Sequence, residues 1–270
     1  MVKIFFTVAF LLVNLYSDEL LDLKIKSFVG EKIYTQNKDF IDIIFTPSEN
    51  FYTQDKIDNV KVIKTLKDNG LLNLFFKKPQ ELNLSFTTNG SPLFFLKIMS
   101  DTLREIGYYR YVTVSSNLNV SEFTWSISLN SEYATDPIIF QQELLKRGCD
   151  IVDIKRESPT KWSYNIDMSD GYLDIQDLYG FSQIVLKRSL YAHWLNVEGV
   201  STLEIKSTRR NSWYPYITYY DKSLHLIKVL KKDKKTKYIK LNIPIQASYI
   251  KISDLYTLKN VKDPLILIPK

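Results

Sequence analysis

The chain has 270 residues and a mass of 31.7 kDa, which is long for one hydrophobic core and indicates about two domains. Hydrophobic residues make up 45% and charged residues 24%, a balance that excludes an intrinsically disordered chain. The net charge of +6 comes from 29 Lys and only 7 Arg set against 30 acidic residues, which is too mild for a nucleic-acid groove.

The first residues form a candidate secretory signal. Lys3 precedes an apolar run from Ile4 to Val13, and Ser17 offers a small residue at a cleavage position. Ten apolar residues rise only about 15 Å as a helix, half of the roughly 30 Å hydrocarbon core of a bilayer. We therefore predict a signal peptide over residues 1–17 and a secreted, periplasmic mature protein that does not span the membrane. An uncleaved N-terminal anchor is the alternative.

Residues 18–80 are predicted to be a mainly helical segment. An apolar stripe runs from Leu20 to Val29 and stops at Gly30. A second amphipathic stretch, from Val60 to Leu66, ends at Asn69-Gly70, which is typical of a helix C-terminus.

Residues 81–168 carry the most regular pattern of the chain. Two helices are expected, each with a capping residue, a proline in the first turn and a glycine at the end: Ser91-Pro92 to Gly107, and Asp136-Pro137 to Gly148. Alternating apolar residues predict strands at 82–86, 109–114, 123–129, 151–155 and 162–168. The order β-α-β-β-α-β with one extra strand predicts a ferredoxin-like (split βαβ) domain.

Residues 171–270 are predicted to contain strands only. The candidates, at intervals of about ten residues, are Gln183–Arg188, Tyr191–Val197, Ser201–Ser207, Tyr214–Tyr220, Leu224–Lys231, Lys237–Ile243, Ser248–Ser253 and Leu265–Ile268. Short strands at this spacing are typical of a β-sandwich or jelly roll. The fold class expected for the whole chain is therefore α+β.

Two resemblances follow from these patterns. Pro215-Tyr-Ile-Thr-Tyr-Tyr-Asp221, with Tyr249-Ile-Lys-Ile252 downstream, resembles the small jelly-roll modules of pre-peptidase C-terminal domains. That resemblance implies a non-catalytic module. The whole chain, rich in Lys, Asn and Ile behind a signal peptide, resembles uncharacterised periplasmic proteins of campylobacter-type bacteria, which include accessory scaffold proteins of the flagellar motor.

The residues that usually carry catalysis or bind metals are scarce. Two His and one Cys, Cys149, do not supply a paired-spacing zinc site, and His193 and His225 are expected to be ordinary strand residues. Four aspartates between Asp167 and Asp177 surround a glycine, but their spacing differs from that of a calcium-binding EF-hand loop. We interpret them as a linker, with calcium as the alternative, and we expect no enzyme activity, no metal and no cofactor.

A basic run lies between two of the predicted strands. Its lysines are Lys231, Lys232, Lys234, Lys235 and Lys237. A solvated hairpin that protects a sheet edge explains them, and contact with an anionic surface of the cell envelope is the alternative.

An aromatic strand is the main candidate for binding. Alternation places Trp213, Pro215, Ile217 and Tyr219 on one face, and Tyr214, Tyr216, Thr218 and Tyr220 on the other. With Ile217 and Tyr219 on the core side, the opposite row faces outward. The candidate binding residues are Trp213, Tyr214, Tyr216 and Tyr220. A plain sheet surface, a protein partner and a glycan stacked on the rings remain alternative interpretations.

We therefore expect a non-catalytic periplasmic protein that acts through protein or cell-envelope contacts. A glycan- or peptidoglycan-binding module is the alternative, and a hydrolase with two distant carboxylates is a third hypothesis.

Overall fold

The computed structural model describes residues 19–270, so the predicted signal peptide lies outside the described residues. The chain divides into two compact units, Met1–Tyr172 and Leu173–Lys270. The predicted helical segment and the domain predicted at 81–168 thus fall within one unit.

The N-terminal part of the first unit is helical, with one small hairpin. A helix covers residues 19–29, followed by α2 (Glu31–Gln36), α3 (Lys38–Ile44), the 3-10 helix η1 (Ser48–Phe51) and α4 (Asn59–Asp68). Between η1 and α4, two-residue strands β1 (Tyr52–Thr53) and β2 (Lys56–Ile57) pair. The sequence did not predict this hairpin, since its turn, Gln54-Asp55, has positive φ at both residues without a glycine.

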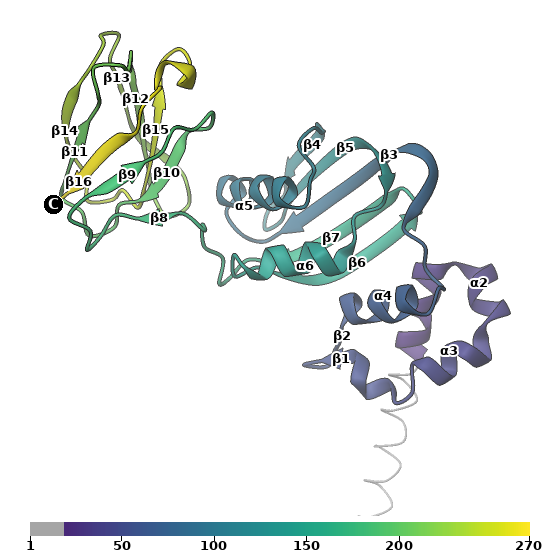
Figure 1. The fold of residues 1–270 in the computed structure, drawn as a ribbon. Coiled ribbons are helices and arrows are strands. Elements are labelled where there is room, and N and C mark those ends of the chain that lie inside the picture. The colour runs from purple at the N-terminus through teal and green to yellow at the C-terminus, as the bar shows by residue number, and fades with distance from the viewer. Residues whose placement is uncertain (1–18) are drawn as a thin grey trace, which may run out of the picture. The chain divides into compact units, whose positions relative to one another are not determined.

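A five-stranded sheet with two helices forms the rest of the first unit (Figure 1). Its elements are β3 (Phe75–Thr88), α5 (Pro92–Glu105), β4 (Val112–Leu118), β5 (Phe123–Tyr133), α6 (Pro137–Leu145), β6 (Asp150–Ser158) and β7 (Lys161–Asp167). The strand order is β4-β5-β3-β7-β6, with β3 antiparallel to β5 and parallel to β7. The first unit is therefore a mixed sheet combined with helices.

Both helices cover the same face of this sheet. The ring of Phe95 on α5 lies 6.1 Å from that of Phe123, and Phe140 on α6 lies 5.6 Å from Phe86. Phe123 and Phe86 belong to the buried rows of β5 and β3. The alternation that predicted these strands therefore identified their core sides correctly.

Both helices start where they were predicted to start, but only the second has a side-chain cap: the Ser91 side chain makes no capping hydrogen bond at the start of α5. The Asp136 side chain accepts a hydrogen bond from the backbone N–H of Ile138 at the start of α6. Gly148, after α6, has φ of 67°, and a Cβ there would lie 2.1 Å from the carbonyl oxygen of Asp170. Only glycine fits that position without a local rearrangement.

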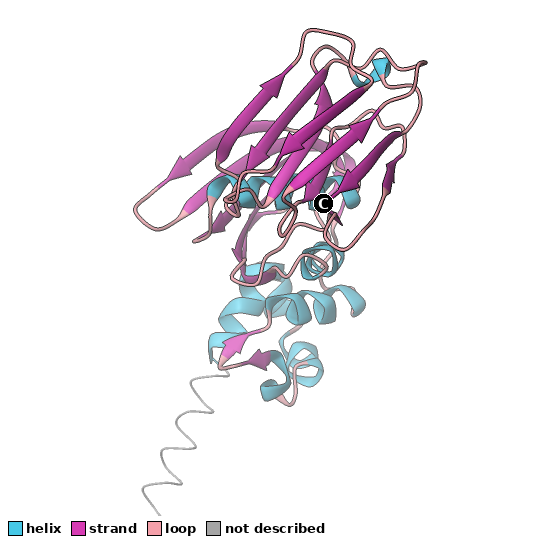
Figure 2. Cartoon of the chain, turned by 90° about the vertical axis from the view of Figure 1, so that its left-hand side faces the viewer, coloured by secondary structure: helices cyan, strands magenta, loops and turns pink. Residues whose placement is uncertain are grey.

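The second unit consists of strands and loops, with one short 3-10 helix (Figure 2). Its strands are β8 (Gln176–Asp177), β9 (Ile184–Leu186), β10 (His193–Asn196), β11 (Thr202–Lys206), β12 (Pro215–Tyr220), β13 (Leu226–Lys231), β14 (Tyr238–Asn242), β15 (Tyr249–Asp254) and β16 (Leu265–Pro269); η2 is Leu258–Asn260. All eight predicted strands are present, while β8 was not predicted.

These strands form two sheets around one core. One sheet has the order β13-β12-β15-β10-β8, and the other β14-β11-β16-β9. Trp213, Ile217 and Ile250 from the first sheet region and Leu203 and Leu267 from the second are fully buried in the same hydrophobic cluster. The outer face of the five-stranded sheet is therefore the side on which the predicted binding residues other than Trp213 are found.

Candidate functional site

The aromatic strand β12 divides its side chains between core and surface largely as its alternation predicts. Ile217 and Tyr219 are buried, and Tyr214, Tyr216 and Tyr220 are half-buried on the other side. Thr218 is the exception to the predicted outward row, because it is 4% exposed. The outward row is therefore three tyrosines around a covered threonine.

Trp213 is a core residue and does not belong to the exposed site. Its side chain is 0% exposed, and the indole N–H donates to the carbonyl oxygen of Ser253 at 2.9 Å. A buried indole needs such an acceptor, and this one fixes the ring inside the unit. The prediction that Trp213 contacts a ligand is therefore corrected.

Residues of neighbouring strands complete the outer face around β12. The ring of Trp194 on β10 lies 5.0 Å from that of Tyr220. The Lys251 ammonium lies 5.4 Å from the Trp194 ring centre, and the Lys231 ammonium lies 5.2 Å from that of Tyr216. Both distances lie in the range of a cation–π contact. We call these five residues, Trp194, Tyr216, Tyr220, Lys231 and Lys251, the aromatic–lysine face.

Strand pairing explains why these residues meet. Thr218 pairs with Lys251, and Lys251 pairs with Trp194, so these three lie in one row across β12, β15 and β10. Tyr216 pairs with Lys231 on β13. Directly paired side chains on one face of a sheet lie about 5 Å apart at Cβ, which is close enough for a lysine to cover a ring. The aromatic–lysine face therefore forms because β10, β15, β12 and β13 pair in this register, and the sequence alone did not predict that register.

The structure joins the two sites that the sequence predicted separately. Lys231 is the first lysine of the basic run and also covers Tyr216. The loop that follows is held to β12 by two backbone bonds, from Lys232 N to Pro215 O and from Thr236 N to Trp213 O, each 2.9 Å. The remaining lysines of the run, Lys232, Lys234, Lys235 and Lys237, are all exposed.

The single acidic residue of that loop is already engaged. The hydroxyl of Tyr256 donates to the carboxylate of Asp233, and this bond raises the pKa of Tyr256. The Tyr256 ring in turn meets the Tyr214 ring edge-on at 5.2 Å. Tyr214 is therefore part of the loop's support, and the exposed lysines give this end of the unit a positive charge.

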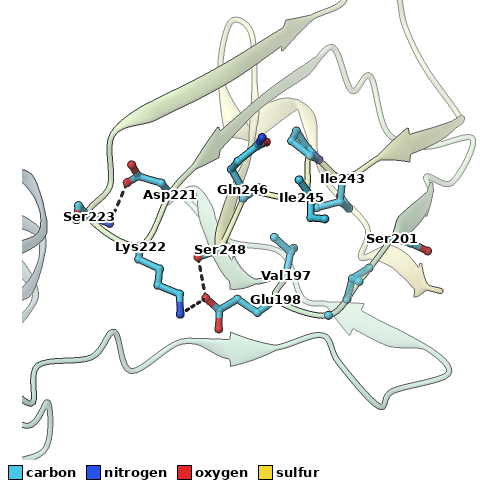
Figure 3. A pocket seen from close by; sticks show the side chains of 14 residues that line it. Val197, Glu198, Ser201, Asp221, Lys222, Ser223, Ile243, Ile245, Gln246 and Ser248 are labelled. Atoms are coloured by element: carbon cyan, nitrogen blue, oxygen red, sulfur yellow. Dashed lines mark hydrogen bonds and ion pairs between the residues drawn. The ribbon is translucent and has the colours of Figure 1, made fainter.

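A hollow of about 730 Å³ lies among the loops at one end of the second unit (Figure 3). Glu198 accepts a hydrogen bond from the Ser248 hydroxyl at 2.7 Å and pairs with Lys222 at 3.4 Å. Ile245, beside them, is 95% exposed. Two carboxylates line the hollow: Glu198, which is paired with Lys222, and Asp221, which accepts a hydrogen bond from the backbone N–H of Ser223 at 2.9 Å. The hollow is therefore a polar cleft in which both carboxylates already have partners.

A second hollow, of about 760 Å³, lies in the first unit, and sequence reasoning missed it. The rings of Phe75 and Tyr133 line it beside Tyr108, whose hydroxyl accepts a hydrogen bond from Thr135 at 3.1 Å. Burial raises the pKa of Tyr108 to about 12, so this hydroxyl stays protonated at neutral pH. The lining residues come from three separate stretches of the chain, 67–75, 106–108 and 133–139, which explains why no local pattern signalled the hollow.

The other candidate residues have structural roles. Cys149 is buried, and burial raises the pKa of its thiol to about 11. His193 lies on β10 as predicted, and burial lowers its pKa. The prediction that His225 is a strand residue is wrong: it precedes β13, and its ring lies 3.0 Å from the Asp221 carboxylate at the surface. Among residues 19–270, no group of three or more His, Cys, Asp or Glu side chains is placed to hold a metal ion.

Two of the four aspartates from Asp167 to Asp177 act as turn residues. Asp167 accepts a hydrogen bond from the backbone N–H of Ser169, and Asp177 accepts one from Tyr179, both at 2.9 Å. Each bond spans two residues, the pattern of an Asx-turn. Their geometry fits the linker interpretation.

Within the described residues, no helix has both the length and the apolar character needed to cross a bilayer.

Comparison with known proteins gave no match to a family model, to a curated protein or to a solved structure.

Proposed function

We propose that this chain is a non-catalytic protein of the bacterial periplasm that works through contacts with proteins or with the cell envelope. The observation that supports the proposal is the aromatic–lysine face, where Lys231 and Lys251 lie over the rings of Tyr216 and Trp194. Rigid amphipathic rings beside lysines supply contact area and positive charge at low entropic cost.

The charge of this face favours an anionic partner. Four exposed lysines continue from Lys231 along the loop, and the one acid among them, Asp233, is hydrogen-bonded to Tyr256. An acidic protein surface or an anionic envelope polymer fits such a patch, and its binding weakens as salt rises. An accessory scaffold protein of the flagellar motor is the specific version of this proposal that the sequence resemblance implies.

A glycan- or peptidoglycan-binding module is the second candidate function. The observation that favours it is the pair of half-buried rings of Trp194 and Tyr220, 5.0 Å apart on one sheet face, since aromatic rings can stack on sugars. The two functions differ in their dependence on charge. Sugar stacking depends on the rings, whereas contact with an acidic protein depends on the lysines as well.

The proposal also assigns a fold class to each of the two predicted domains. We assign the sheet and helices of 81–168 to the ferredoxin-like (split βαβ) class, and 171–270 to a jelly-roll-like sandwich related to pre-peptidase C-terminal modules. The element order β-α-β-β-α-β-β and the two sheets around one core support these assignments.

Two binding experiments test the proposal. Sedimentation with purified peptidoglycan is expected to drop at least several-fold in the variant Tyr216→Ala with Tyr220→Ala if the face binds glycan. Chemical cross-linking in periplasm followed by mass spectrometry is expected to enrich a partner that Lys231→Glu with Lys251→Glu loses. The matched control is Lys206→Glu with Lys240→Glu, two exposed lysines on the other sheet. Binding that survives both face variants in both assays contradicts the proposal.

Export is tested separately. The intact mass of periplasmic protein is expected to lack residues 1–17, and replacing Leu11 and Leu12 by Asp is expected to block export, because charge in the apolar run opposes its partition into the bilayer. A mass that retains residues 1–17, found in the membrane fraction, identifies an anchor instead.

A further inference from the structure

The two edge strands of the sheet in the first unit differ in how far other parts of the chain cover them. The edge strands are β4 and β6, and the N-terminal helical segment covers β6 (Figure 1). The Lys24 ammonium donates to the carbonyl oxygen of Ile154 at 2.8 Å, and the Asn59 amide donates to that of Val152 at 3.3 Å. Side chains outside the sheet thus occupy backbone acceptors along β6.

Strand β4 has no such cover. Among the described residues, the backbone of Val112–Leu118 is hydrogen-bonded only through its pairing with β5. Val112, Val114 and Leu118 are 68%, 62% and 67% exposed. One side of this strand therefore presents unpaired N–H and C=O groups flanked by apolar side chains.

The composition of β4 also lacks the usual protection of an edge. Its sequence, VTVSSNL, contains no charged residue and no proline. The edge strand β13 in the second unit carries Lys228 and Lys231, β14 carries Lys240, and β8 and β9 have only two and three residues. Proteins normally blunt exposed edges with charge, proline or short length, because such edges pair with other chains. An uncharged seven-residue edge is therefore an available pairing site.

A positively charged hollow adjoins the N-terminal end of β4. It has a volume of about 590 Å³, and Arg104, Tyr109 and Arg110 are among its lining residues. Arg104 pairs with Asp101 at 2.9 Å, whereas Arg110 is exposed and forms no ion pair or hydrogen bond with the described residues. A carboxylate placed at this end of β4 would meet an unpaired guanidinium.

A second copy of this chain does not suit the edge. Val112 pairs with Ser128, on the face without helices, whereas Leu118 pairs with Phe123, on the helix-covered face, because the register shifts between Thr113 and Ser115. Directly paired residues of antiparallel strands share a face, so a two-fold pairing of β4 with itself could not place Val112 against Leu118.

We propose that β4 binds an extended segment of another protein as an added antiparallel strand, with an acidic residue of that segment beside Arg110. Antiparallel pairing brings the C-terminal end of the added segment to the N-terminal end of β4, where Arg110 lies. Main-chain hydrogen bonds supply affinity, and the apolar side chains and Arg110 supply specificity, as in other complexes formed by strand addition. This surface is separate from the aromatic–lysine face and does not depend on it.

Two synthetic peptides test the proposal with the full chain. Both are end-blocked octapeptides of alternating Val and Thr, one ending in Glu and the other in Gln. The Glu peptide is expected to bind up to about fivefold more tightly, the range of an exposed ion pair, measured by fluorescence anisotropy. Hydrogen–deuterium exchange is expected to slow at residues 112–118 on binding, and a Glu peptide with alternate N-methylated amides is expected not to bind.

Three variants separate this site from non-specific association. Arg110→Gln is expected to abolish the preference for the Glu peptide while retaining binding of the Gln peptide. Val114→Lys is expected to lose both peptides, and Val229→Lys, the matched change on edge strand β13, is expected to retain both. Unchanged exchange at 112–118 under saturating peptide, or a preference for Glu that survives Arg110→Gln, overturns the proposal. Sedimentation showing dimers that Val114→Lys dissolves would assign the edge to a second copy instead.

Discussion

Trp213 and Tyr216 lie three residues apart in the aromatic strand region and have opposite roles. Trp213 is fully buried and bonded to Ser253, whereas Tyr216 is half-buried under Lys231. Trp213→Ala is expected to lower the free energy of unfolding by about 3–5 kcal/mol, because it removes a large core side chain. Tyr216→Ala is expected to lower it by about 1 kcal/mol or less. Urea denaturation measures both, and equal losses would contradict the division of the strand into core and surface residues.

Because of the Cys149 thiol, we expect the free energy of unfolding to change with pH in the alkaline range. Burial raises its pKa from 9.0 to about 11, with Asp167 adding to the shift and Arg147 opposing it. In the unfolded chain the thiol ionises near its ordinary pKa, so between about pH 9 and about pH 11 the unfolded state loses its proton first. The stability contributed by the neutral thiol is complete below that window and is lost as pH rises through it.

Cys149→Ala isolates this contribution. Urea midpoints measured from about pH 8 to about pH 11 are expected to fall less steeply in Cys149→Ala than in the original chain. The difference between the two proteins at about pH 8 reports packing alone and serves as the control. If the urea midpoints of the two proteins fell in parallel with pH, the thiol would ionise equally in the folded and unfolded states, and the prediction would be wrong. Tyr108 and Tyr219, each with a pKa raised by burial to about 12, add a further decline common to both proteins.

At the scale of elements, the start of α6 depends on Asp136. Its carboxylate accepts the N–H of Ile138 and pairs with Lys67 on α4. Asp136→Ala is expected to cost about 1–2 kcal/mol of stability, because it removes both the cap and the pair. Asp136→Asn retains a capping oxygen and is expected to lose about 0.5 kcal/mol from the partly exposed ion pair. Thermal denaturation of the two variants decides this, and an Asn variant as unstable as the Ala variant would assign the effect to charge rather than to capping.

Local signals explain which elements could be predicted. The helix starting at Pro92 and the helix starting at Pro137 have a capping residue, a proline and a terminal glycine within their own segments, and both occur as expected. Strand β4 starts at Val112 rather than at Tyr109, because Tyr108 N bonds to Leu103 O and continues the end of α5. The aromatic spacing of Tyr109 and Tyr111 resembled a strand, but tertiary packing of Tyr111 against Trp125 accounts for it.

Of the candidate site, only the residues of β12 could be predicted from the sequence. Alternation along β12 separated Tyr216 and Tyr220 from Ile217 and Tyr219, since side-chain period is a local property. Trp194 and Lys251 joined the face through pairing between strands that are distant in sequence. The buried state of Thr218 has the same origin, because its cover comes from neighbouring strands. Register between distant strands depends on the whole core, so no segment of the sequence alone specifies it.

At the scale of the molecule, the boundary between Tyr172 and Leu173 predicts two independent folding units. Tyr172 is fixed to the first unit by bonds from its N–H to Arg147 O at 3.0 Å and from its hydroxyl to Lys146 O at 2.8 Å. The second unit has its own core, which both of its sheets share. A unit of about a hundred residues buries enough apolar surface to fold by itself.

A fragment covering residues 173–270 is therefore expected to unfold cooperatively in urea, with a midpoint that matches one transition of the full chain. It is also expected to retain the aromatic–lysine face, because all five of its residues lie on strands of this unit. Trp213→Ala in the fragment is expected to lower the midpoint as it does in the full chain, since the bond to Ser253 lies within the unit. A fragment with a broad, non-cooperative transition, or one that Trp213→Ala leaves unchanged, would show that the core of this unit needs residues before Leu173.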